Sequence, residues 1–182
     1  DEHMDSRLAD LIWAICEESS WVLPPNSPLA LGENSLPLPD IYEPLVDSAA
    51  ANTALDLCMT AQLIGERLYD ITPQLLQRIE YEIERRIIEP FLAAHDMDWM
   101  CGSKSDAAVC LRGVMMSFLT FEQDGRRRWQ CMRKAWGVLD RLLMALPQDG
   151  SIPGGVSEWL DTVGPIMDCL NMVRTATNNR ID

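Results

Sequence analysis

Two adjacent carboxylates precede a tryptophan near the start of the chain, in the run Glu17-Glu18-Ser19-Ser20-Trp21. Glu17 and Glu18 could exchange protons with a sugar, and Trp21 could stack on a sugar ring. The alternative is a solvated helix end, with Trp21 packed beneath the proline-rich segment that follows. We favour this alternative because aromatic side chains usually serve hydrophobic cores.

Four of the other tryptophans divide into two pairs by their sequence context. Trp99 and Trp159 fall in predicted loops, where sugar contact and packing are equally good interpretations because loop residues often carry function. Trp129 and Trp136 lie two helical turns apart in an apolar pattern, which predicts that both belong to the core.

The histidines and cysteines show no metal-binding spacing. His95 with Asp96 and Asp98 is the best local cluster for proton transfer or a metal, but a solvated loop is the better interpretation. The 6 Cys residues contain no Cys-x-x-Cys pair, and most fall on predicted apolar helix faces. We therefore expect structural thiols, and we expect no metal and no cofactor.

The elements that must position these side chains are helices. Apolar residues recur at three- and four-residue spacing, and no segment alternates as a strand would, so the fold class predicted is all-α. Short connections favour antiparallel helical hairpins. The helices are expected at residues 6–20, with Ser6 as N-cap, and at 45–64, 73–90, 108–122, 125–146 and 164–177. Residues 22–44, rich in proline, are expected to be irregular.

The helix beginning at Pro73 has the clearest predicted faces. Thr72 is the expected N-cap and Pro73 the first residue. The buried stripe is predicted to consist of Leu76, Ile79, Ile83 and Ile87. The solvent face is predicted to carry Arg78, Glu82 and Arg86, which are spaced as i,i+4 ion pairs.

Composition excludes some functions. The chain has 182 residues and a net charge of -13, which disfavours nucleic acid as a partner. No apolar run is long enough to span a bilayer, and residues 1–5 lack the pattern of a signal peptide, so no membrane partner is expected. The cellular compartment is left open. Residues 1–182 are expected to form one helical domain.

Several motifs together resemble the helical domain of the heparinase II/III-like polysaccharide lyases. These are residues 13–21 (Trp-Ala-Ile-Cys-Glu-Glu-Ser-Ser-Trp), 81–86 (Tyr-Glu-Ile-Glu-Arg-Arg) with 89–91 (Glu-Pro-Phe), Asp149-Gly150, and 174–182. The resemblance implies an incomplete α/α toroid of antiparallel hairpins. It also implies that this chain is an internal part of a larger protein, with a C-terminal β-sandwich domain as a missing partner. The implied chemistry is β-elimination at a uronic acid of an acidic polysaccharide.

The sequence departs from the family pattern where the substrate cleft is expected. An Asn-Asn-Trp-Asn run of the family aligns with residues 104–107 here, which read Lys-Ser-Asp-Ala. After Asp149-Gly150, the family's acidic position falls on Gly154 and its tyrosine on Glu158, whereas Trp159 matches. The resemblance therefore implies that lyase activity is impaired or absent in this chain.

Our sequence hypothesis is a helical domain that binds or cleaves uronic-acid polysaccharides or oligosaccharides, with lyase activity impaired or absent in this chain. The alternative is a non-catalytic helical module that binds other proteins. An aromatic and polar groove would favour a sugar, and a flat apolar patch would favour a protein. No catalytic residue is assigned. The candidate substrate-binding residues are Trp99, Lys104, Asp106, Glu158, Trp159, Glu17, Glu18 and Trp21.

Overall fold

A computed structural model of the chain describes residues 2–23, 44–95, 97–101, 106–152 and 155–180. Helices are the regular secondary structure of these residues, and no strand occurs among them, which confirms the all-α prediction. The main helices are α1 (Glu2–Glu17), α2 (Ser48–Ile71), α3 (Pro73–Ile83), α4 (Glu89–Ala93), α5 (Ala107–Phe121), α6 (Gly125–Ala145) and α7 (Gly155–Ala176). A π-helical turn, η3 (Glu84–Ile88), joins α3 to α4, and a 3-10 turn, η4 (Asp98–Cys101), precedes α5.

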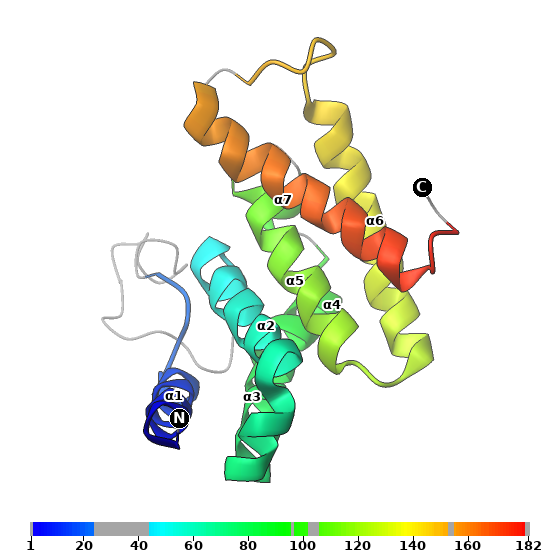
Figure 1. The fold of residues 1–182 in the computed structure, drawn as a ribbon. Coiled ribbons are helices and arrows are strands. Elements are labelled where there is room, and N and C mark those ends of the chain that lie inside the picture. The colour runs from blue at the N-terminus through cyan, green and yellow to red at the C-terminus, as the bar shows by residue number, and fades with distance from the viewer. Residues whose placement is uncertain (1, 24–43, 96, 102–105, 153–154, 181–182) are drawn as a thin grey trace, which may run out of the picture.

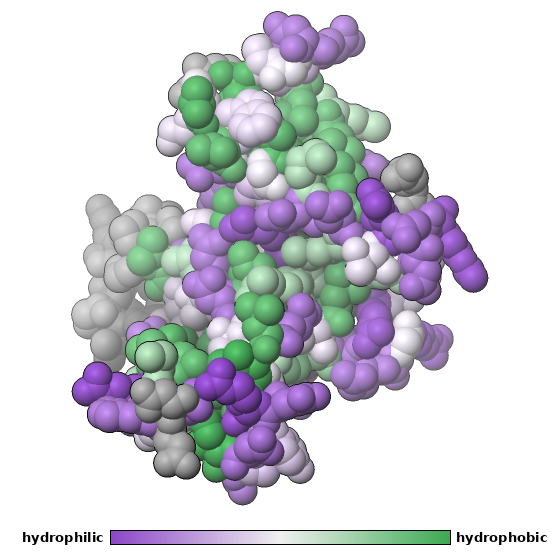
Figure 2. Space-filling view, viewed as in Figure 1, coloured by the Kyte–Doolittle hydropathy of each residue, from purple (hydrophilic) through white to green (hydrophobic). Residues whose placement is uncertain are grey.

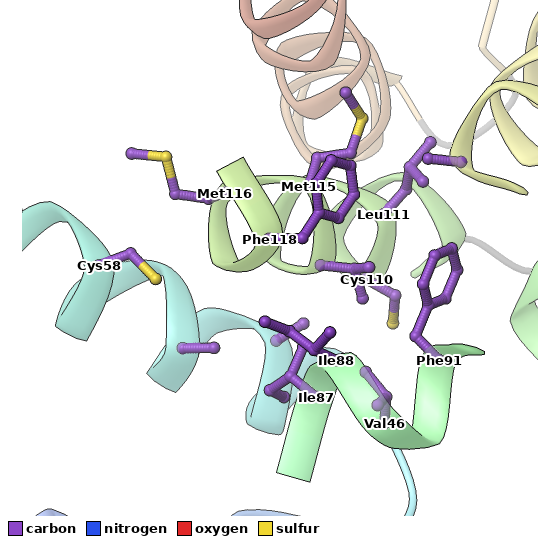
Figure 3. Close-up of a cluster of buried hydrophobic side chains, with 14 of the residues drawn as sticks. Val46, Cys58, Ile87, Ile88, Phe91, Cys110, Leu111, Met115, Met116 and Phe118 are labelled. Atoms are coloured by element: carbon purple, nitrogen blue, oxygen red, sulfur yellow. The ribbon is translucent and has the colours of Figure 1, made fainter. Parts of the chain in front are cut away.

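Helix α5 is the centre of the fold. It packs against α2, α6, α7 and η3, and α7 crosses in front of it (Figure 1). Ten of its residues are buried, on nearly all sides of the helix. A helix that is apolar around most of its circumference must be covered by other elements. Figure 3 shows this core, where side chains of α5 meet Ile87 and Ile88 of η3 and Phe91 of α4.

Small residues allow α2 and α5 to approach closely. Ala50, Ala51 and Ala54 of α2 are buried, and Gly113 of α5 lies against them. A Cβ atom added to Gly113 would lie 2.2 Å from the backbone oxygen of Ala51. The glycine is therefore required by the packing of the two backbones, since no side chain fits between them.

The predicted boundaries around α3 and α6 are confirmed. Thr72 is the N-cap residue of α3 and Pro73 its first residue, as expected from the fixed φ of proline. Asp124 caps α6, because its Oδ1 accepts hydrogen bonds from the N–H groups of Arg126 and Arg127. These hydrogen bonds lower the pKa of the Asp124 carboxyl. Pro90 follows the π-helical turn, where the altered hydrogen-bond ladder tolerates the missing N–H.

Three other predicted boundaries are wrong. Helix α1 begins at Glu2 rather than at Ser6. Helix α2 continues through Gly65 to Ile71, with a kink at Ile64 (φ -134°) where the sequence predicts an end. Helix α7 begins at Gly155, nine residues before the predicted start, and contains Pro165. Packing outweighs the local signal in α2, where Leu68 beyond Gly65 is buried, and in α7, where Pro165 and Ile166 are buried.

The predicted face of α3 needs one correction. On α1, Leu11 fits the apolar spacing of the helix, but it is exposed. Glu82 and Arg86 were predicted to face solvent, but both are buried. The i,i+4 pattern fits a solvated ion-pair ladder and a buried one equally, so spacing alone does not distinguish them.

Five cysteines are buried, which confirms their prediction as structural thiols, whereas Cys101 is exposed. Burial raises the pKa of the Cys58 thiol to about 12 and that of Cys16 to about 11. Both thiols are therefore protonated and unreactive near neutral pH. None of the described helices is long and apolar enough to cross a membrane.

Candidate functional site

The carboxylate pair at the end of α1 does not form a site around Trp21. The indole of Trp21 is buried, and its Nε1 donates to the backbone oxygen of Ile15 at 2.9 Å. Glu17 and Glu18 are exposed, and Glu17 accepts a hydrogen bond of 2.8 Å from Nε1 of Trp13. Trp21 is thus buried within the fold, and most of the proline-rich segment expected to cover it lies outside the described residues.

Trp99 is also held within the core. Its Nε1 donates to the backbone oxygen of Val46 at 2.8 Å, and its ring stacks on Phe91 with the centroids 6.3 Å apart. Buried in this way, the indole presents no face to a ligand. Asp106 immediately precedes α5 and is partly buried. Lys104 lies outside the described residues.

Glu158 and Trp159 lie at the start of α7, in the helix rather than in the predicted loop. Glu158 is half-buried, and Trp159 is 45% exposed. Figure 1 places this end of α7 far from α1, so Trp159 and Trp21 belong to different regions of the molecule. A sugar contact through Glu158 and Trp159 stays a prediction.

His95 and its neighbours give no metal-like cluster in the part of the chain that the structure covers. His95 and Asp98 are exposed, and Asp96 lies outside the described residues. No group of three His, Cys, Asp or Glu side chains gathers as metal ligands would among residues 2–23, 44–95, 97–101, 106–152 and 155–180.

A buried polar group, here called the Glu82 cluster, joins α3 and η3 to α1. Its members are Glu82, Arg78, Arg85 and Arg86. The Glu82 side chain is 0% exposed, and its Oε2 accepts from Nε of Arg86 at 2.5 Å. Arg85 lies 2.7 Å from the same oxygen, and Arg78 lies 3.0 Å from Oε1.

The arginines of the Glu82 cluster also contact the end of α1. The guanidinium of Arg86 lies 4.6 Å from the centre of the Trp21 ring and donates to the backbone oxygens of Glu18 and Cys16. Arg78 donates to the Cys16 oxygen at 3.2 Å. The Cys16 oxygen is one of the last carbonyls of α1, which have no partner within the helix, and Glu18 directly follows the helix. The cluster therefore holds α1 to α3.

A groove of about 800 Å³ lies between α2, α5, α6 and α7. We call it the α5 groove. Its apolar lining includes Leu55, Met59, Met116, Leu119, Met132, Met172, Trp129 and Trp136, and its polar lining includes Gln62, Arg112, Arg128, Asp168, Asn171 and Thr175. This volume falls in the range of small-molecule sites in proteins.

Two tryptophans of α6 form one wall of the α5 groove. Trp129 and Trp136 meet edge to face, with ring centroids 5.5 Å apart and an interplanar angle of 89°. Trp129 is 56% exposed, so its prediction as a core residue is wrong. Trp136 is half-buried and packs against the core. An exposed indole held by a neighbouring ring is a rigid stacking surface.

Charged and amide groups stand beside this aromatic wall. Arg112 of α5 donates from Nη1 to Asp168 of α7 at 3.2 Å and from Nη2 to Asn52 of α2 at 3.1 Å. Gln62 donates to Oγ1 of Thr120 at 2.8 Å. Arg128 donates from Nε to the backbone oxygen of Glu122 at 2.8 Å. The groove thus combines an apolar floor with a cationic and amide rim.

Sequence reasoning missed the residues of the α5 groove. Arg112 and Asp168 lie 56 residues apart, and no local motif marks either of them. Trp129 has the helical spacing of a core residue, and the basic run at residues 126–128 was the only sign of a polar surface nearby. These side chains form a site only because α7 crosses α5 next to α2 and α6.

Comparisons of the chain with family models and with curated proteins return no match. The resemblance to the heparinase II/III-like lyases accordingly stays a prediction.

Proposed function

We propose that this chain is a helical carbohydrate-binding domain whose α5 groove holds an acidic oligosaccharide. The observation that carries this proposal is the exposed face of Trp129 beside the two arginines of the groove. A sugar ring has an apolar face that stacks on an indole, and its hydroxyl groups suit amide and guanidinium partners. A uronic acid adds a carboxylate, for which arginine is the preferred partner.

Binding is better supported than cleavage. β-Elimination requires a base with a suitable pKa near the acidic proton of the sugar. Among the described residues lining the groove, Asp168 is the one group that could accept a proton, and it is paired with Arg112. We therefore infer a domain related to the heparinase II/III-like helical toroid, in which α2–α3 and α5–α6 are hairpins of that toroid and the lyase activity is impaired or absent.

The test is to titrate the protein with uronate oligosaccharides and to measure binding by the change in tryptophan fluorescence and by calorimetry. We expect binding of at least one acidic tetrasaccharide from a set containing galacturonate, glucuronate and mannuronate. Trp129→Ala should abolish the fluorescence change, because it removes the stacking surface. Trp13→Ala, which removes an exposed tryptophan on α1, is the matched control. Failure of every acidic sugar to bind would contradict the proposal.

A protein partner is the second candidate, and the methionines favour it. Met59, Met116, Met132 and Met172 line the α5 groove, and flexible thioethers suit the apolar face of an amphipathic helix. Helix α7 also exposes Val156, Leu160, Met167 and Leu170. Figure 2 shows apolar side chains over the upper part of the molecule, where α7 begins. If sugars fail while a partner helix binds and is lost in Met132→Ala, this second function replaces the first.

A further inference from the structure

We propose that Asp168 occupies Arg112 as an internal substitute for a ligand carboxylate, so that an acidic ligand must displace it. This inference rests on the proposed function, because it concerns how the α5 groove receives an anion. Arg112 would bind the ligand carboxylate, and competition from Asp168 would lower the affinity for that carboxylate.

Arg112 is well placed to be a fixed anchor. It belongs to α5, whose backbone lies in the centre of the core, and its side chain is 22% exposed. Nη2 is held by Asn52 at 3.1 Å, so the guanidinium keeps its position when its other contact changes. Its Nε is buried and has no hydrogen-bond partner among the described residues. Nη1 and Nη2 each carry a second N–H, which the hydrogen bonds to Asp168 and Asn52 do not use.

Asp168 is well placed to be displaced. Its side chain is 51% exposed on α7, and it meets Arg112 through one oxygen at 3.2 Å. An ion pair open to water contributes little to stability, so releasing it costs little. The freed carboxylate can turn toward solvent, where its charge is fully hydrated. A ligand carboxylate that makes two parallel N–H···O bonds would form the stronger contact.

The geometry gives opposite expectations for the two residues. Removing Arg112 removes the anchor, so acidic ligands should be lost selectively. Removing the charge of Asp168 frees the anchor, so acidic ligands should bind more tightly. A residue that merely supports the fold would show neither selectivity for acidic ligands nor a gain in affinity.

The experiment compares tetragalacturonate with galactotetraose, two sugars that differ in the carboxylates. Binding is measured by calorimetry for the wild-type chain, Asp168→Asn, Arg112→Gln and Arg112→Lys. The control is Asp161→Asn, which removes an exposed charge from α7 two helical turns earlier. A second readout is the rate at which phenylglyoxal modifies Arg112, followed by mass spectrometry, which needs no sugar.

We expect Asp168→Asn to bind tetragalacturonate about twofold to fivefold more tightly, in line with the strength of an exposed ion pair. The affinity for galactotetraose should stay the same, and Asp161→Asn should have a much smaller effect. Arg112→Gln should lose the preference for the acidic sugar, and Arg112→Lys should keep part of it. Arg112 should be modified faster in Asp168→Asn, and tetragalacturonate should protect it.

Two results would overturn the inference while leaving the proposed function in place. The first is weaker or unchanged binding of tetragalacturonate by Asp168→Asn. The second is an equal gain in Asp161→Asn, which would reflect general electrostatics alone. A different result would contradict the proposed function itself. In that result Arg112 is modified faster in Asp168→Asn than in the wild-type chain, but neither protein binds an acidic sugar. The proposed role of Asp168 toward a ligand would then fail as well.

Discussion

The Glu82 cluster and the Arg112–Asp168 pair use the same kinds of side chain in very different surroundings. Glu82 is 0% exposed and meets three arginines, whereas Asp168 is 51% exposed and meets one. A buried carboxylate without its arginines would leave charge in the core, so that cluster is required for folding. An exposed pair can open at little cost, so Arg112 and Asp168 are available to a ligand.

Glu82→Ala should produce the largest effect and would test the structural half of this comparison. It leaves Arg86, which is buried, without its carboxylate partner. We expect the free energy of unfolding to fall by about 3–5 kcal/mol, as when one partner of a buried ion pair is removed. Urea unfolding followed by circular dichroism measures this change. Glu80→Ala, an exposed position on the same helix, should change stability by no more than about 0.5 kcal/mol.

Gly113→Ala tests the packed side of α5, one residue after Arg112. The added Cβ would lie 2.2 Å from the Ala51 oxygen, so α2 and α5 would have to separate. We expect a loss of about 1–3 kcal/mol from overpacking, visible as a lower melting temperature. Gly137→Ala is the control, because its Cβ would meet only the end of the Arg141 side chain at 3.7 Å. There the helix should gain about 0.5–1 kcal/mol. Equal effects at the two glycines would show that the α2–α5 approach is looser than described.

The buried cysteines of the core and the exposed Cys101 should differ in their reactivity toward thiol reagents. At pH 8 a disulfide reagent should label Cys101 alone, since the other five thiols are buried.

Above about pH 8.5, where an unfolded thiol ionises, the unfolded chain binds fewer protons than the native one. The pKa of Cys58, about 12, keeps its native thiol protonated there. The free energy of unfolding should therefore fall as pH rises from 8 to 11, as urea titrations would measure. Cys101→Ser should abolish the labelling without altering this pH dependence.

Asp168→Asn should have the smallest effect on stability and would test the other half of the comparison. It breaks an exposed ion pair, so the free energy of unfolding should change by no more than about 1 kcal/mol. Differential scanning calorimetry would measure the shift, with Asp161→Asn as the control. A loss as large as that of Glu82→Ala would mean that Arg112 and Asp168 hold α5 to α7, and the two groups would then share one structural role.

The helical periodicity and the caps predicted the fold class because they report on local energetics. Asp124 marks the start of α6 because its side chain accepts hydrogen bonds from two backbone N–H groups. Pro73 marks the start of α3 through its fixed φ, and Thr72 makes no side-chain capping bond. Gly65 and Pro165 are equally strong local signals, yet α2 and α7 continue through them. There the burial of neighbouring side chains outweighs a local preference of about 1–3 kcal/mol.

The candidate site was less accessible from the sequence. Trp21 and Trp99 were candidates for sugar binding because of their sequence context. Each is buried, and its indole N–H donates a hydrogen bond to a backbone oxygen. Trp129 was assigned to the core because its spacing matches that of a buried stripe. Spacing identifies which residues share a helix face, and it does not say whether another helix covers that face.

The sequence by itself determined an all-α chain and the first residues of α3 and α6. Only the tertiary structure decided that Glu82 is buried and that Arg112 meets Asp168 across a groove walled by Trp129. The physical reason is the range of the interactions. Helix caps and periodicity depend on residues within a turn or two, whereas burial of a charge or opening of a groove depends on where distant helices cross.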